Sequence, residues 1–117
     1  MLTTIPLNYW AIVRELMQGF PGTEESTSYE TPAFKVKKKL LLRLKEDGVI
    51  LVIHSDDRDI WLEDDPSVFF FTEHYRNYPY VLVRLDKIRK SKLKELIIRS
   101  WKEIAPEKLV QEYEAKR

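Results

Sequence analysis

The stretch that decides the fold is AFKVKKKLLLRLKEDGVILVIH, residues 33–54. In its first half, apolar and basic side chains alternate with a period of two, which is typical of antiparallel strands with one wet face. The apolar positions are Phe34, Val36, Leu40, Leu42 and Leu44. Glu46-Asp47-Gly48 then provides turn residues, and Val49–His54 is apolar on both faces, which predicts a strand near the middle of the sheet.

The amino-terminal flank changes from a helical pattern to a polar one. Residues 6–18 carry apolar side chains at helical spacing, and Pro6 suits a first helical turn. Residues 22–32 are rich in Thr, Ser and Glu, which predicts a loop over the surface.

The carboxyl-terminal flank returns to short strands and then to helices. Acids at 56–59 favour a helix start, and residues 68–71 and 80–85 are β-rich. A helical stripe runs from Leu93 to Ile104 behind Ser91, its expected N-cap, and a last short helix follows Ala105-Pro106.

These elements predict one α+β domain over residues 1–117. The order α-β-β-β-α-β-β-α-α gives a two-layer fold, with an antiparallel sheet of about five strands and helices on one face. The residues that we expect to be buried are Leu40, Leu42, Leu44, Val81, Val83, Leu96 and Trp101.

Composition excludes several classes of site. The 117 residues contain no cysteine and only three glycines, so there is no thiolate metal site, no disulfide and no glycine-rich phosphate loop. No uncharged run approaches the ~18 residues of a membrane span. We therefore expect a cytoplasmic protein that binds no membrane and needs no cofactor.

Charge is arranged in blocks although the net charge is only +1. Residues 35–45 hold six bases and no acid, residues 46–74 hold Arg58 against nine acids, and residues 75–94 hold seven bases against Asp86. A basic patch forms only if the fold brings the two basic blocks together.

Several strings in this order resemble the MmcQ/YjbR family of small bacterial proteins. They are Thr31-Pro32-Ala33-Phe34-Lys35-Val36, Asp65-Pro66-Ser67-Val68-Phe69, His74-Tyr75-Arg76, Val81-Leu82-Val83-Arg84-Leu85, and Trp101 with Ala105-Pro106. The resemblance implies a fold similar to type III secretion chaperones, and the family is usually labelled DNA-binding for a proposed double-wing surface. The sequence departs from the family where Glu73 replaces a common proline and where residues 89–92 are basic.

The candidate nucleic-acid interface is a basic sheet face with nearby loop residues. Spaced lysines can neutralise phosphates, and Tyr75, Tyr78 and Tyr80 can stack on bases. The alternative is that lysine only keeps the face wet and discourages edge pairing. The candidate binding residues are Lys35, Lys37, Lys39, Arg43, Lys45, His74, Tyr75, Arg76, Arg84, Arg89 and Lys90.

Two other constellations have simpler explanations. His74 beside Arg76 suits phosphate binding or acid–base work, but closing a turn between strands is the favoured explanation. The acids between Asp56 and Asp65, with His54 and His74, can hold a divalent metal, although helix-start electrostatics accounts for the same acids.

The sequence thus leaves two functions open. The first is weak, sequence-tolerant DNA binding by a monomer, and the alternative is a chaperone-like adaptor for a protein partner. An enzyme ranks last because no nucleophile, base and orienting group occur together.

Overall fold

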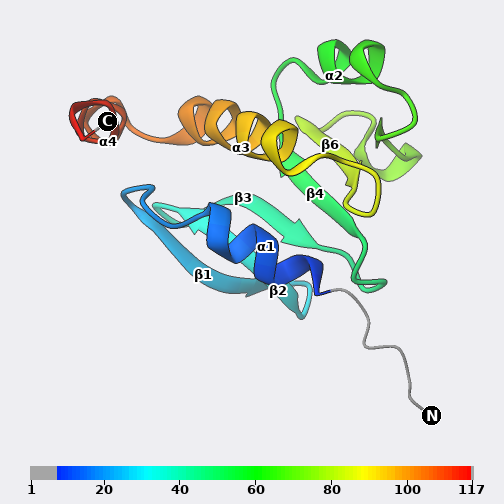
Figure 1. The fold of residues 1–117 in the computed structure, drawn as a ribbon, viewed down its shortest axis with the longest axis horizontal. Helices are drawn as coiled ribbons and strands as arrows, with labels where there is room; N and C mark the ends of the chain where they lie inside the picture. Colours follow the sequence, from blue (N-terminus) through cyan, green and yellow to red (C-terminus); the bar gives the residue numbers. More distant parts are fainter. Residues whose placement is uncertain (1–7, 117) are drawn as a thin grey trace.

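An open antiparallel sheet and four α-helices make up the computed structural model, which describes residues 8–116 (Figure 1). The strands are β1 (Thr23–Ser28), β2 (Thr31–Val36), β3 (Lys39–Leu44), β4 (Ile50–His54), β5 (Phe69–Phe70) and β6 (Tyr80–Arg84). The helices are α1 (Tyr9–Leu16), α2 (Arg58–Asp64), α3 (Lys90–Ile104) and α4 (Glu107–Ala115), with a 3₁₀ turn, η1 (Glu73–Tyr75). The α+β class is confirmed.

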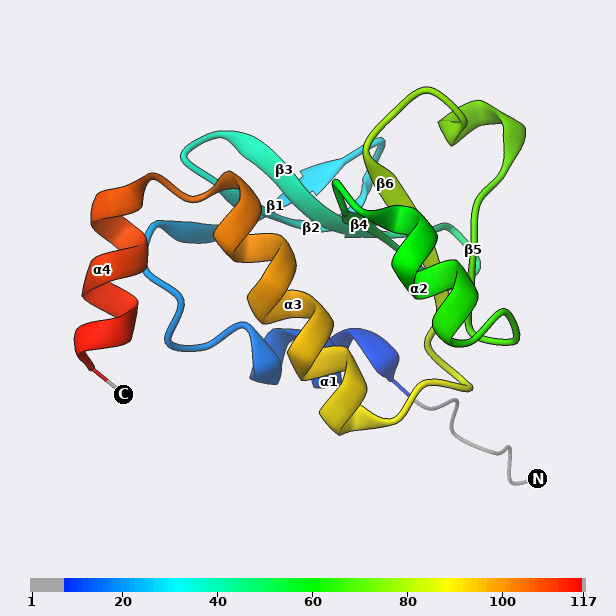
Figure 2. The ribbon, with the colours of Figure 1, turned by 90° about the horizontal axis from the view of Figure 1, so that it is seen from above.

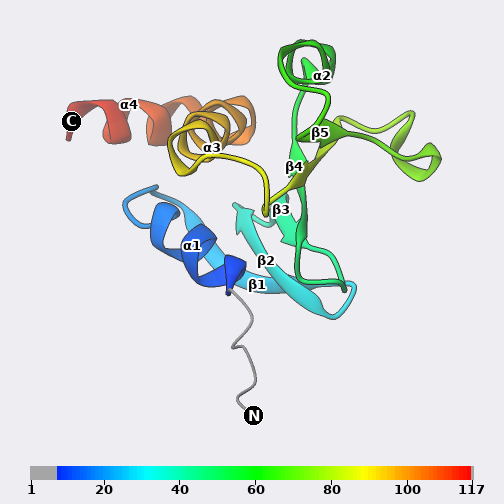
Figure 3. The same ribbon diagram turned by 45° about the vertical axis from the view of Figure 1, so that its right-hand side comes forward.

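The sheet has six strands in the order β1-β2-β3-β4-β6-β5, and every neighbouring pair is antiparallel. Figure 3 shows its strong twist, with β1 and β2 crossing the direction of β4. The expected loop over residues 22–32 was wrong, because most of it forms β1 and the turn into β2. A polar edge strand lacks the apolar alternation by which buried strands are recognised.

The helices cover one face of the sheet, as predicted. Helix α3 packs on β3 and β4, and α2 packs on β5 and β6. Figure 2 shows α2 and α4 at opposite ends of this layer, with α3 between them and α1 beneath it. Within residues 8–116, no helix combines the length and apolar character needed to cross a membrane.

Helix starts differ in detail from the sequence prediction. Asn8 caps α1 by accepting a hydrogen bond from Ala11 N at 3.1 Å, whereas Pro6 lies outside the described residues. Helix α3 begins at Lys90, so the expected N-cap at Ser91 was wrong, and the Arg89 side chain makes no capping bond.

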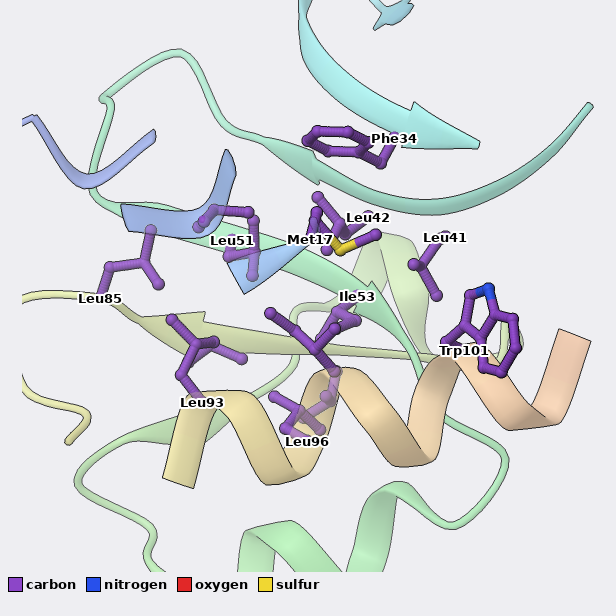
Figure 4. Close-up of a cluster of buried hydrophobic side chains, with 14 of the residues drawn as sticks. Met17, Phe34, Leu41, Leu42, Leu51, Ile53, Leu85, Leu93, Leu96 and Trp101 are labelled. Atoms are coloured by element: carbon purple, nitrogen blue, oxygen red, sulfur yellow. The ribbon is translucent and has the colours of Figure 1, made fainter. Parts of the chain in front are cut away.

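The core lies between the sheet and the helices. Figure 4 shows Leu42, Leu51 and Ile53 from the sheet facing Leu93 and Leu96 of α3. The burial expected for Leu42, Leu44, Val81, Val83, Leu96 and Trp101 is confirmed.

Leu40 is only half-buried, because a β-bulge interrupts the alternation. Phe34 pairs with Leu42 while Lys35 pairs with Leu40, so Leu41 is an extra residue on β3. Leu41 and Leu42 therefore both reach the core, and Leu40 is moved to the opposite face with Lys35.

That opposite face, which we call the outer face, is partly buried instead of fully exposed to solvent. Val52, Leu82 and Tyr75 form a second buried cluster on it, with Ile50, Phe70 and Tyr80 packed around them. Tyr75 comes from η1, so the segment between β5 and β6 folds over the sheet and covers part of this face.

Candidate functional site

Four lysines surround the turn between β2 and β3. Lys37 and Lys38 have φ of 50° and 72°, which is the left-handed pair that a tight two-residue hairpin turn requires. Lys37, Lys38 and Lys39 are exposed, and Lys35 is half-buried. We call these residues the lysine turn: Lys35, Lys37, Lys38 and Lys39.

The lysine turn carries no ion pair within residues 8–116. By contrast, many other cations each form an ion pair with an acid, with a nitrogen–oxygen distance of 4.0 Å or less. These cations are Arg14, Arg76, Lys90, Lys92, Arg99, Lys102 and Lys116. Glu24 is the register partner of Lys35 on β1, but the two side chains form no ion pair. What distinguishes this turn is that four cations without an ion pair in the described chain lie within five residues of sequence.

Arg43 differs from the other predicted cations because it is buried, with 6% of its surface exposed. Its Nη1 donates to Thr31 Oγ1 at 3.1 Å, and its Nη2 donates to the Tyr75 hydroxyl at 3.3 Å. Arg43 does share the outer face with Lys35 and Lys45, but the expectation that it is wet there was wrong, because η1 closes over it. Lys39 pairs with the buried Val36 and therefore lies on the other face, against the prediction.

A hollow of about 270 Å³ opens beside Arg43 on the outer face. The residues that line it are Tyr29, Arg43, Lys45, Glu46, Thr72, His74 and Tyr75. Lys45 N donates to Ile50 O at 2.8 Å, and Ile50 pairs with Arg84, so these two cations lie on the same face with one strand between them. One residue of each basic block therefore lies on this face, with β4 between them.

The two ends of β3 thus hold separate basic groups. Lys39 and Lys45 are six residues apart along the strand, which corresponds to roughly 20 Å. The guanidinium of Arg84 lies 4.0 Å from the centroid of the Phe70 ring. Lys37, Lys38 and Lys39 are therefore separate from the hollow beside Arg43, whereas Lys35 lies between the two on the outer face.

Arg89 and Lys90 belong to neither group. They open α3 in the helical layer, and Lys90 Nζ lies 2.6 Å from Glu15 Oε1 of α1. The predicted binding residues consequently do not form one continuous surface.

The His74 segment is held as a structured turn. Tyr75 N donates to Thr72 O at 2.9 Å, and Arg76 pairs with Glu73 at 2.7 Å. That hydrogen bond from Arg76 lowers the pKa of Glu73 below its ordinary value. Of the three tyrosines expected to stack on bases, Tyr75 is buried and Tyr80 half-buried, whereas Tyr78 is 56% exposed.

Arg58 fixes the same segment from α2, a role that the sequence did not reveal. Its Nη1 donates to the carbonyls of Tyr75, Tyr78 and Tyr80, and its Nη2 donates to Arg76 O. The guanidinium also lies 4.1 Å from the centroid of the Phe71 ring. The sequence did hold one signal for a structural role of Arg58, which is that it is the single base among nine acids in residues 46–74.

The residues that come together as possible metal ligands differ from the set predicted from the sequence. Ligand atoms of His54, Asp56 and Glu103 lie within 4.8 Å of one another, whereas His74 belongs to the hollow beside Arg43. His54 Nδ1 is 2.9 Å from Glu103 Oε1, which also accepts from Asp56 N at 3.1 Å. These contacts join β4 to α3, so a structural link accounts for the cluster.

Comparisons with known proteins agree with this fold. The YjbR family model matches residues 18–103. Uncharacterised proteins of Mycobacterium tuberculosis and Mycobacterium bovis are each 32% identical over 121 aligned residues, covering 89% of this chain and 94% of theirs.

A crystal structure of a Deinococcus radiodurans protein with a DUF419 domain is also similar. It has a TM-score of 0.64 and 22% identity, and the match covers 76% of this chain and 72% of that one. At that identity, the similarity concerns the fold alone. The sequence match over most of the chain carries the assignment, and this protein belongs to the YjbR family.

Proposed function

We propose that this protein binds DNA through phosphate contacts of the lysine turn, without a preference for base sequence. The observation that carries the proposal is the cluster of four lysines within residues 35–39 that has no ion pair in the described chain. Ammonium groups that are free of acids displace the cations condensed on DNA phosphates, and this release of counterions favours binding at low salt.

The backbone of the turn supports this function. Lys37 and Lys38 occupy left-handed positions, where glycine or asparagine is favoured and a long side chain costs about 1 kcal/mol or more. Two lysines at these positions present their side chains outward from a rigid hairpin. Lysine contacts phosphate as a point charge, so this arrangement positions DNA but does not read bases.

The test compares two triple variants that each remove three positive charges. Lys37→Gln/Lys38→Gln/Lys39→Gln alters the lysine turn. Lys87→Gln/Lys94→Gln/Lys108→Gln removes exposed lysines that also have no ion pair with residues 8–116 but are separated along the chain. Arg43→Glu is unsuitable, because it would bury a carboxylate and disturb folding.

Binding is measured by fluorescence anisotropy with a labelled short duplex at low salt. We expect roughly micromolar affinity for the native chain, at least about tenfold weaker binding for the lysine-turn variant, and little change for the control. Absent native binding, or equal losses in both variants, would refute the proposal. The adaptor function for a protein partner would then rank first.

A further inference from the structure

Arg43 is a buried cation whose hydrogen-bonding capacity is largely unused. A guanidinium has five N–H donors, and within the described chain Arg43 places one on Thr31 and one on Tyr75. Its Nε is fully buried and has no partner. Arg58 makes four hydrogen bonds to carbonyls, so Arg43 is poorly satisfied by comparison.

The charge of Arg43 is also poorly neutralised. The carboxylate within 4.0 Å is that of Glu46, at 3.9 Å, and its side chain is 66% exposed. That separation is too long for a hydrogen bond. Because an uncompensated buried charge is costly, the site favours an anion that approaches more closely than Glu46 does.

The hollow beside Arg43 offers room and further donors for such an anion. Lys45, Thr72 and His74 line it together with Arg43, and its volume is about 270 Å³. Tyr29 stands at the rim, 73% exposed and with φ of 52°, and its ring centroid lies 4.9 Å from Arg43 Cζ. A strained turn therefore holds an exposed aromatic side chain over the guanidinium.

We propose that this hollow binds a terminal phosphate, the dianion of a phosphate monoester. Arg43 and Lys45 bring two positive charges to the hollow against the single carboxylate of the exposed Glu46, so a dianion gains more there than a singly charged carboxylate. Because Nε is fully buried, Arg43 would contact phosphate oxygens with the remaining N–H groups of Nη1 and Nη2, and Lys45 and Thr72 would complete the set of donors. This inference stands apart from DNA binding by the lysine turn, because Lys37, Lys38 and Lys39, which the lysine-turn variant changes, lie at the other end of β3 from Lys45.

The direct test is a titration of the ¹⁵N-labelled protein with inorganic phosphate, followed by NMR at the Nε–H signal of Arg43. We expect a saturable shift of this signal and none with sodium chloride at the same ionic strength. An unchanged signal, or an equal change with chloride, would overturn the proposal and leave a hollow filled only by water.

Two variants test the charge argument without altering Arg43. Lys45→Gln is expected to weaken phosphate binding about threefold to fivefold, and Glu46→Gln to strengthen it by a similar factor, since each changes one nearby charge. Lys94→Gln, an exposed lysine of α3, serves as the control and should leave the affinity unchanged. Equal affinity for the native chain and both test variants would contradict the site.

A final pair of probes separates free phosphate esters from DNA ends. A short oligonucleotide with a 5′-phosphate is compared with the same oligonucleotide ending in a 5′-hydroxyl. Tighter binding of the phosphorylated form, with displacement of inorganic phosphate, assigns the hollow to DNA ends. Equal binding alongside a positive phosphate titration assigns it to small phosphate esters. The lysine-turn variant should keep its response to phosphate, so failure of either proposal is recognisable by itself.

Discussion

Arg58 shows how one residue determines the shape of the outer face. It bonds to four carbonyls of residues 75–80, and so holds η1 and the following turn against the sheet. Tyr75 thereby reaches the Arg43 guanidinium. A planar fork with donors on separate nitrogens is needed for this, and lysine cannot reproduce it.

Arg58→Lys is therefore expected to lower the free energy of unfolding by about 2 kcal/mol, because hydrogen bonds from a charged donor are lost. Amide exchange in residues 72–80 should become faster. The matched control is Arg76→Lys, whose exposed ion pair with Glu73 should contribute less than about 0.5 kcal/mol. Urea unfolding measures both variants, and equal losses would contradict the role given to Arg58.

Helix α4 packs against the turn before β1. Gly22 has φ of 75°, and a Cβ added there would overlap Leu109 of α4. Gly48, in the turn between β3 and β4, has the same φ of 75° with open space around it.

Gly48→Ala should cost roughly 1 kcal/mol in unfolding free energy from backbone strain alone, and Gly22→Ala about 1 kcal/mol more from overpacking. Thermal unfolding of both variants gives this difference. Faster amide exchange confined to α4 in Gly22→Ala would confirm its origin. Equal stability of the two variants would show that α4 does not press on Gly22.

A second link joins α1 to β1 through Glu25. Hydrogen bonds from Arg14 and then Trp10 lower the pKa of Glu25 below its ordinary value of 4.5. A lowered pKa stabilises the fold above the unfolded value, and this contribution disappears as pH falls through the folded value. Native chain and Glu25→Gln should differ in unfolding free energy by at most about 1 kcal/mol at pH 7 and converge well below pH 4. A difference independent of pH would exclude this origin.

Sequence patterning predicted the elements that bury an apolar face and missed those that do not. The alternation through Leu42 and Leu44 identified the sheet, but β1 is polar because it lies at an edge. The bulge at Leu41 left no local signal, so the displacement of Leu40 could not be foreseen.

The sequence predicted which basic residues belong to the candidate sites, but it did not predict which of them lie together in space. Arg43 contacts Tyr75, which lies 32 positions away, and that contact depends on a covering turn held by Arg58. Long-range contacts of this kind separate Arg43 from the lysine turn, although both lie in one basic block of sequence.

For the whole molecule, we predict a monomer in solution. Among the described residues, the large apolar side chains that are exposed are Tyr29, Ile60 and Tyr78. Ile60 and Tyr78 line one hollow with mostly polar residues, and Tyr29 lines another, so no large apolar patch forms. Edge strand β1 carries Glu24 and Glu25, which discourage pairing with a second sheet. Light scattering at micromolar concentration should return 14.0 kDa, and a stable dimer mass would contradict this expectation.

Because the net charge is near zero, DNA binding has to come from a local group of positive charges and not from the charge of the whole molecule. With a sum of +1, long-range attraction is weak, so affinity depends on the few lysines that acids leave free. The number of phosphates neutralised is then small, and binding should be easily abolished by salt.

The most direct test is the slope of log affinity against log salt concentration for duplex DNA. We expect a slope of about −3 to −4 for the native chain, and a slope reduced in magnitude by roughly 2 to 3 for Lys37→Gln/Lys38→Gln/Lys39→Gln. The Lys87→Gln/Lys94→Gln/Lys108→Gln control should keep the native slope. A native slope near zero, or one that the lysine-turn variant leaves unchanged, would contradict the account.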